Sequence, residues 1–127
     1  MYYNLVAPVC LCLVSATVPP LTYRTNVKLE GKLVVRVYYG APNYDKKSRR
    51  DHEYVLVLPK HIDVIGIPGD DFDSESHKNI SAIQVVTDAE LKPYLNKTVV
   101  INGTLSQAMT GHDHTPVILD IKTIQPK

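Results

Sequence analysis

The chain has 127 residues, which is the length of one domain, and its hydrophobic fraction of 44% is enough for one modest core. Fourteen Lys and Arg side chains against 13 Asp and Glu side chains give a net charge of +1. No overall electrostatic field therefore attracts nucleic acid or an anionic membrane. We do not expect nucleic acid as a partner, and a protein partner or small ligand has to be recognised by a local surface.

Residues 1–16 are apolar, carry no charged side chain and end in Val14-Ser15-Ala16. Small residues at these positions are typical of a signal-peptide cleavage site, so we expect a signal peptide cleaved near Ala16. The segment lacks a basic start, and the alternative is an apolar N-terminal strand. A spanning helix needs about 20 apolar residues, so no stable membrane span is expected in the mature chain.

Both cysteines, Cys10 and Cys12, lie inside this N-terminal segment. Cleavage near Ala16 would leave a mature chain without cysteine. Disulfides, cysteine zinc sites and cysteine nucleophiles would then be excluded together.

Residues 17–25 are expected to form an N-terminal extension, and the first strand follows at residues 27–39. Odd positions there are apolar and even positions are mostly charged, which is the pattern of a half-buried strand. Gly31 falls on the apolar face and predicts a β-bulge or sharp coil. Residues 40–44 form a turn cluster, and residues 45–52 are expected to be a solvated charged loop. The alternative is an anion or nucleic-acid patch formed by Lys46, Lys47, Arg49 and Arg50.

Further strands are expected at residues 53–58, where Pro59 ends the strand, at residues 61–67 and at residues 80–86. The acidic residues 70–75 lack the glycine and distal glutamate of a calcium loop, so an acidic surface loop is favoured over a calcium site. Residues 87–95 predict a short helix, because Thr87 or Asp88 can cap it and Glu90 can complete a capping box.

Two closing strands are expected at residues 98–105 and 115–121. The order of elements predicts a mainly β fold, a small five- to six-stranded OB-like barrel over residues 26–125 with one short helix before the last two strands. An open β-sandwich is the alternative architecture.

The loop between the closing strands holds the densest chemistry of the chain. His112 and His114 are two residues apart, so in an extended backbone they point to the same side and can share a divalent transition metal. A carboxylate or a third histidine would have to complete the site, and His52, His61 and His77 qualify by residue type alone. In the structural alternative, Gly111 permits a tight turn, and the histidines and Thr110 or Thr115 hydrogen-bond the loop backbone and hold the hairpin in shape. No cofactor is required.

Catalysis is not indicated by the residues. Ser106 and His112 alone do not make a triad, and no nucleophile, base and oxyanion donor can be grouped from the sequence. We therefore expect a protein that is not an enzyme. OB barrels bind ligands on their strands and loops, and the aromatic side chains available for such contact are Tyr38, Tyr39, Tyr44 and Tyr54.

Three segments together resemble a bacterial family of small exported proteins that is known as a domain of unknown function. They are Gly40-Ala41-Pro42-Asn43-Tyr44, Val99-x-Ile101-x-Gly103-Thr104-Leu105 and Thr110-Gly111-His112-Asp113-His114-Thr115-Pro116-Val117. The family pattern reads G-P-P-N-Y, V-x-V-x-G-T-L and T-G-H-H-H-T-P-V, and this chain departs from it at Ala41 and Asp113. The resemblance implies a periplasmic or secreted OB-like domain and no activity.

Three functions follow as hypotheses. The first is an exported non-enzymatic binding or interaction domain whose contact surface comprises Asn43, Tyr44, Thr110, Gly111, His112, Asp113, His114 and Thr115. The second is a metal-binding protein that uses His112 and His114. The third is a protein inhibitor or immunity-type partner that docks through the charged loops at residues 46–50 and 70–75.

Overall fold

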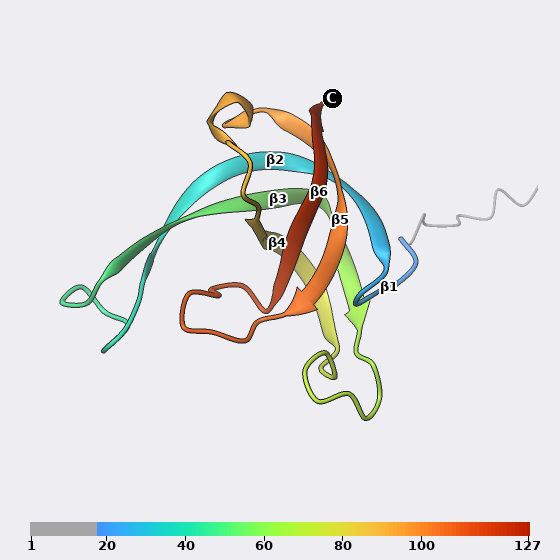
Figure 1. Ribbon diagram of the computed structural model, residues 1–127, viewed down its shortest axis with the longest axis horizontal. Helices are drawn as coiled ribbons and strands as arrows, with labels where there is room; N and C mark the ends of the chain where they lie inside the picture. Colours follow the sequence, from blue (N-terminus) through green and yellow to red (C-terminus); the bar gives the residue numbers. More distant parts are fainter. Residues whose placement is uncertain (1–17) are drawn as a thin grey trace, which may run out of the picture.

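The computed structural model describes residues 18–127 and is mainly β, as expected (Figure 1). One mixed six-stranded sheet has the order β1-β3-β2-β5-β6-β4. No helix among the described residues has the length and apolar character needed to cross a membrane. The strands are β1 (Leu21–Thr22), β2 (Asn26–Tyr39), β3 (Arg50–Ile65), β4 (His77–Val86), β5 (Thr98–Gln107) and β6 (Val117–Pro126).

β2 is long enough to serve two neighbours. Its first half pairs with β5 up to Lys32, and from Lys32 onward it pairs with β3. Both ladders run without a register shift, so of the two features predicted at Gly31 the bulge is wrong and the sharp coil is left. Glycine is required there for a different reason, because a Cβ would collide with the backbone carbonyl of Val57.

β3 continues through Pro59, so the prediction that Pro59 ends a strand is wrong. The ladder between β3 and β4 shifts register between Val57 and Ile62. Pro59 lies in this interruption, where the strand needs no N–H donor toward β4. One bent strand therefore replaces the two strands expected at residues 53–58 and 61–67.

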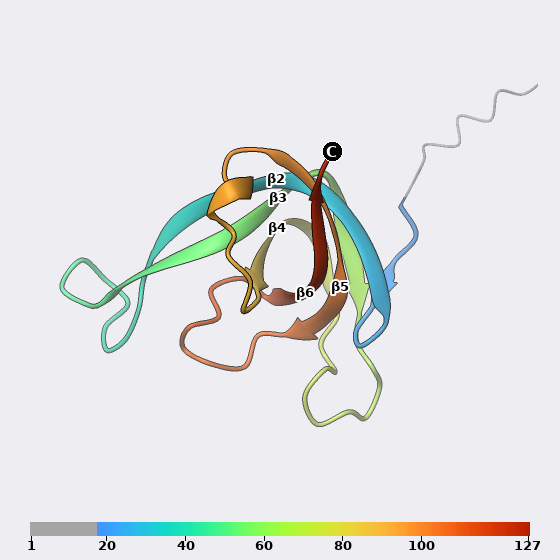
Figure 2. The same ribbon diagram turned by 45° about the horizontal axis from the view of Figure 1, so that its top comes forward.

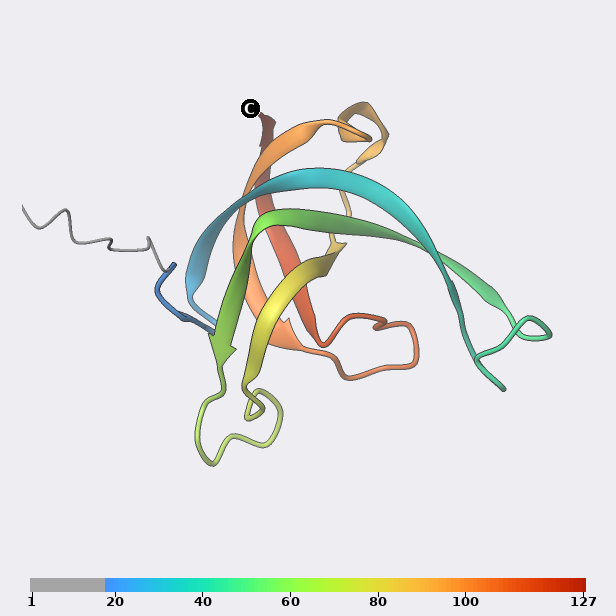
Figure 3. The same ribbon diagram turned by 180° about the vertical axis from the view of Figure 1, so that it is seen from behind.

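The pairing of strands returns to its starting point. β3 pairs with β2 and also with β4, while β4 pairs in parallel with β6, and β6 pairs with β5. Figures 2 and 3 show these strands curving around a shared interior. The fully buried large side chains there include Tyr23, Leu33, Leu56, Ile83, Ile101, Leu105 and Leu119.

The short helix predicted at residues 87–95 is wrong, because only one 3-10 turn, η1 (Lys92–Tyr94), forms. Thr87 Oγ1 accepts from the N–H of Ala89, and the Glu90 carboxylate accepts from the N–H of Lys92. Each side chain closes a turn two residues ahead, which competes with helix formation. Pro93 further limits the helical segment to a single turn.

The far end of the β2–β3 hairpin projects beyond the rest of the sheet (Figure 1). Pairing of β2 with β5 stops at Lys32, and pairing of β3 with β4 starts at Val55. Between these points the two strands pair only with each other among residues 18–127. We call this two-stranded ribbon, with its connecting loop at residues 40–49, the arm (residues 34–54).

Residues 21–25 are part of the packed sheet. β1 pairs in parallel with β3, and the Tyr23 ring is buried in the core. Arg24 holds the acidic loop, since its guanidinium lies 2.7 Å from Asp70 Oδ2 and 2.8 Å from Asp73 Oδ2. Asp73 is buried and also accepts from the N–H of Gln107. The acidic loop lies on the surface as expected, with Asp71, Ser74 and Glu75 exposed, but Asp70 and Asp73 anchor it to the rest of the chain.

Candidate functional site

The loop between β5 and β6, residues 108–116, covers part of the outer face of the sheet. Val55 and Ile118 are buried on that face without joining the main core cluster, and the strand register places Gln84 beside both. Gln84 is itself buried and reaches the loop with both ends of its amide. It donates to the carbonyl of His112 at 3.0 Å and accepts from the N–H of His114 at 2.8 Å.

Thr115 completes this attachment. Its buried hydroxyl accepts from the backbone N–H of Gln84 at 2.9 Å and donates to the carbonyl of Val117 at 2.8 Å. All the polar groups involved are satisfied, which a buried polar network requires. The 108–116 loop is therefore fixed to β4 by hydrogen bonds as well as by its chain connections.

Asp113 shapes the outer part of the loop. Its Oδ2 accepts from the backbone N–H groups of Met109 and Thr110 at 2.8 and 3.0 Å. The Thr110 hydroxyl accepts from the N–H of His112, and its carbonyl accepts from the N–H of Asp113. Short polar side chains stabilise turns in this way. Thr110 and Thr115 thus bond backbone groups, as the structural alternative expects, while Asp113 does so without having been predicted.

His112 and His114 converge on one carboxylate, that of Asp51 on the arm. His114 Nε2 lies 2.8 Å from Asp51 Oδ2 and donates to it, and His112 Nδ1 lies 3.5 Å from the same oxygen. Arg49 binds the carboxylate from the other side, with Nε at 2.7 Å from Oδ1. Gly40 packs against this pair, since a Cβ there would lie 2.7 Å from Arg49 Nε.

The two histidines differ in exposure. The His114 side chain is 9% exposed, whereas that of His112 is 64% exposed. The His114 ring stacks on Tyr38, with centroids 4.6 Å apart and planes 1° from parallel. His114 is therefore a fixed contact between the arm and the 108–116 loop, and His112 presents its ring to solvent.

The carboxylates of the site have opposite pKa shifts. Hydrogen bonds from Arg49 and then from His114 lower the pKa of Asp51, so it is ionised at neutral pH. Burial, followed by the negative charge of Asp51, raises the pKa of Glu53. Both residues project from the same face of β3, because they are two positions apart in a strand.

Asn43 and Tyr44 lie at the tip of the arm, and Tyr44 lies beside the 108–116 loop. A Cβ on Gly111 would come within 3.1 Å of the Tyr44 hydroxyl, so the two loops are in contact. The backbone of Tyr44 is left-handed, with φ of 54°, and its side chain is 56% exposed. The backbone N–H of Asn43 donates to Ser48 Oγ. Gly111 has no left-handed φ, so steric room beside Tyr44, and not turn geometry, is what its small size provides.

Among residues 18–127, one group of ligand-type side chains is close enough to hold a metal. Ligand atoms of Asp51, Glu53 and His114 all lie within 4.8 Å of one another. Sequence reasoning missed both carboxylates because it assigned Asp51 to a solvated loop, whereas β3 begins at Arg50 and Asp51 is buried. Asp51 and Glu53 are two residues apart in a segment that continues as a strand, which places both side chains on one face. This spacing is the feature of the sequence that could have indicated a shared site.

The other candidate residues lie elsewhere. His52 and His61 are exposed on β3, and His77 begins β4 with its Nε2 3.7 Å from Glu75. A groove of about 290 Å³ does run between the start of β4 and the 114–116 segment, and His77 and His114 both line it. No hydrogen bond or ion pair links these two histidines in the described part of the chain.

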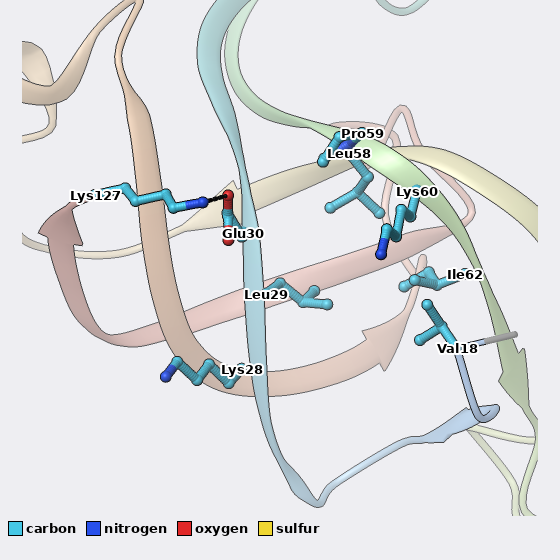
Figure 4. A pocket seen from close by; sticks show the side chains of 9 residues that line it. All are labelled: Val18, Lys28, Leu29, Glu30, Leu58, Pro59, Lys60, Ile62 and Lys127. Atoms are coloured by element: carbon cyan, nitrogen blue, oxygen red, sulfur yellow. Dashed lines mark hydrogen bonds and ion pairs between the residues drawn. The ribbon is translucent and has the colours of Figure 1, made fainter. Parts of the chain in front are cut away.

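A second pocket, of about 400 Å³, has no histidine in its lining, and Figure 4 shows the side chains around it. Leu29, Leu58 and Ile62 contribute its apolar wall, and Lys127 forms an ion pair with Glu30 at its rim, at 2.6 Å. None of the residues that suggested chemistry from the sequence lines it. The arm and the 108–116 loop therefore make the better candidate site.

Comparison with protein families gives one match. The model of a domain of unknown function (DUF4431) matches residues 82–125, which include Gln84, His112 and His114. The C-terminal third of the chain is thus similar to a domain of unknown function, which is the kind of family that the resemblance predicted, and the Gly40–Tyr44 motif lies outside the match. Asp51, Glu53 and Tyr44 lie outside the matched segment. No curated protein and no solved structure matches the chain.

Proposed function

We propose that this chain is an exported, non-enzymatic, OB-like binding domain. Its ligand contacts the surface formed by the 108–116 loop and the tip of the arm, with Asn43, Tyr44 and the residues from Thr110 to Thr115 as the contact residues. The observation that carries the proposal is that the 108–116 loop meets the arm, which is far from it in sequence, at Gly111 and Tyr44 and again at His114 and Asp51.

The strand pairing supports the OB-like assignment. A long first strand pairs with both the second and the fourth main strand, and the third and last strands pair in parallel. Together with the return of pairing from β4 to β3, this is the connectivity of a small five-stranded Greek-key barrel, to which β1 adds a short edge. Loops at the end of such a rigid scaffold commonly carry function.

The contacts of the histidines suit a binding surface. His114 is held by Asp51 and stacks on Tyr38, so it fixes the base of that surface. Binding requires only the exposed side chains of Tyr44 and His112 on a fixed base.

An array of oligosaccharides and peptides probed with the purified protein tests the binding proposal. We expect a retained ligand whose signal falls at least about tenfold in Tyr44→Ala and His112→Ala, because exposed anchors carry most of the contact energy. Phe72→Ala is the matched control, since the Phe72 side chain is as exposed as that of Tyr44 and lies in the acidic loop at residues 70–75. Binding that persists in both site variants, or that falls equally in the control, contradicts the proposed surface.

Export rests on the apolar segment that ends at Ala16 and is tested separately. The protein recovered from the periplasm or medium should begin at Thr17, since cleavage follows Ala16. N-terminal sequencing reads this directly, and Ala16→Lys should block cleavage and leave the longer chain. A secreted protein that begins at Met1 contradicts processing at this site.

A divalent transition metal is a second candidate ligand, favoured by the grouping of Asp51, Glu53 and His114. An imidazole and carboxylates suit zinc, copper or nickel. The sequence predicted a site with His112 and His114 as ligands. In this donor set His114 is kept, and the carboxylates of Asp51 and Glu53 take the place of His112. The metal would have to replace the Arg49 contacts to Asp51.

Thermal unfolding with and without Zn²⁺ tests this candidate. A metal bound only to the folded state stabilises it by about 2.7 kcal/mol at a hundredfold excess over Kd. We expect Tm to rise in the wild type and in His61→Gln, whose histidine is remote, but not in His114→Gln. An unchanged Tm in the wild type at excess Zn²⁺ removes the metal candidate and leaves the binding-surface proposal standing.

A further inference from the structure

The outer edge of β2 in the arm has backbone groups that no other strand uses. Leu33 is the last residue bonded on this side, where its N–H donates to the Lys97 carbonyl and its carbonyl accepts from the Asn96 N–H. Backbone groups alternate along a strand, so those of Val35, Val37 and Tyr39 point the same way. Within residues 18–127 nothing bonds to them.

The side chains along this edge are apolar and exposed. Val35 is 43% exposed, Val37 53% and Tyr39 39%. Natural sheets protect edges with proline, lysine, bulges or covering loops. The stretch from Val34 to Tyr39 contains no proline or lysine, and its ladder with β3 has no register shift. Such an edge is a ready template for another extended strand.

We infer that the β2 edge is a dimerisation surface that pairs antiparallel with the same edge of a second copy. The sequence is self-complementary about Val37. In that register Val37 faces its own copy and Val35 faces Tyr39, a β-branched and aromatic pair of the kind that stabilises neighbouring strands. Arg36 faces Tyr38 and not another Arg36, so no like charges oppose each other.

The length of the free edge fits this partner. On one side the paired strand is limited by Asn96 and Lys97, which occupy the edge at Leu33. On the other side β2 ends at Tyr39, and the Ala41-Pro42 turn follows. Residues 34–40 of one copy therefore span the same stretch of the other. The odd-numbered pairs would form about six backbone hydrogen bonds.

This surface is independent of the proposed ligand site. Tyr38 and Asp51 face the 108–116 loop, whereas the free groups lie along the strand edge, and Val35 and Val37 project from the opposite face of the ribbon. Loss of dimerisation leaves the ligand proposal intact, and loss of ligand binding leaves the dimer intact.

Sedimentation velocity of the purified full chain over a range of concentrations tests the inference. We expect a monomer–dimer equilibrium that Val37→Lys weakens at least about tenfold, because two lysines would meet at the symmetry centre. Val86→Lys is the matched control, as Val86 is 47% exposed and lies at the end of β4. It should dimerise like the wild type.

Cysteine cross-linking gives a second measurement that needs no charge inside the interface. Facing hydrogen-bonded residues have Cα atoms about 5.5 Å apart, which a disulfide can bridge. In a Cys10→Ser, Cys12→Ser background, Val37→Cys should give a covalent dimer under mild oxidation, and Val86→Cys should not. A chain that stays monomeric, a dimer that Val37→Lys leaves unchanged, or equal cross-linking at both positions overturns the inference. Circular dichroism confirms that each variant is folded.

Discussion

Thr115 and Gln84 attach the 108–116 loop to the sheet through bonds that are shielded from water. Both side chains are buried, and the Thr115 hydroxyl bonds two backbone groups at once. Each buried hydrogen bond adds little net stability by itself. Losing one partner costs more, because the other partner is then buried without a hydrogen bond.

Thr115→Val keeps the side-chain shape and removes the hydroxyl. The N–H of Gln84 and the carbonyl of Val117 would then lack a partner, so we expect a loss of about 1–3 kcal/mol in the free energy of unfolding. Urea unfolding measures it. Thr98→Val, at an exposed strand position with no side-chain hydrogen bond in the described residues, should change stability by less than about 0.5 kcal/mol. Equal effects would show that the Thr115 hydroxyl is not structural.

Asp70 links the acidic loop to Arg24 and makes the stability of the fold depend on pH. Hydrogen bonds from the backbone N–H groups of Asp73 and Phe72, and then from Arg24, lower its pKa below the ordinary value of 3.8. A carboxyl with a lowered folded-state pKa stabilises the fold above its unfolded pKa, and this contribution is lost as pH falls through the folded value.

Tm of the wild type should therefore fall as pH drops below about 4, and Asp70→Asn should show a smaller part of that fall because residue 70 no longer titrates. At neutral pH the variant should be less stable than the wild type, since the Arg24 pair is lost. Asp71→Asn, at an exposed neighbouring position, is the control and should follow the wild-type pH profile. Identical profiles for all three proteins would contradict the role of Asp70.

At the scale of elements, the crossing of β2 and β3 depends on Gly31. β2 changes partner at Lys32, and the bent part of β3 passes close to the glycine. A Cβ at position 31 would meet the Val57 carbonyl and, at 3.0 Å, the Leu56 side chain. Because backbone atoms cannot rotate away, the strand itself would have to shift.

We expect Gly31→Ala to lower the free energy of unfolding by about 1–3 kcal/mol, as for overpacking in a dense interior. Gly111→Ala is the matched control, because its Cβ would meet only the hydroxyl of the exposed Tyr44. Thermal or urea unfolding compares the two. A larger loss in Gly111→Ala than in Gly31→Ala would indicate that turn geometry in the 108–116 loop matters more than the strand crossing.

At the scale of the whole molecule, His114 couples the arm to the body. Within residues 18–127 the arm pairs with no strand outside β2 and β3, and the His114 contacts to Asp51 and Tyr38 tie it to the 108–116 loop. The contacts of His112 with Asp51 and of Gly111 with Tyr44 involve exposed side chains. An element with few such contacts opens locally at low free energy, so the mobility of the arm should depend mainly on the buried His114.

His114→Ala removes the stacking and the Asp51 contact, which are together worth roughly 1–2 kcal/mol. We expect amide hydrogen exchange in the arm and the 108–116 loop to accelerate about tenfold, with little change in β5. Mass spectrometry resolves these segments. His61→Ala, which removes an exposed histidine from the same strand as Asp51, should leave the exchange pattern unchanged. Uniform acceleration across the chain would mean that His114 stabilises the fold globally.

The alternation of apolar and polar residues was sufficient to predict a mainly β chain and the approximate positions of its strands. The long first strand and the two closing strands were placed within a few residues of β2, β5 and β6. Period-two alternation is a local property, so it is readable before the partners are known. Pro59 and residues 87–95 were misread because local rules for proline and capping were overridden by a register shift and by side-chain turns.

The sequence by itself determined the class of fold, the similarity of its C-terminal part to a domain of unknown function, and the loop that concentrates the polar chemistry. Only the tertiary structure decided which residues that loop contacts. From sequence, Asp51 was assigned to a charged loop and Gln84 was one polar residue in a strand. Pairing of β3 with β2 and β4 places both side chains against residues 112–115. Contacts between residues 28 to 63 positions apart depend on strand register, and register is set by the packing of the whole sheet.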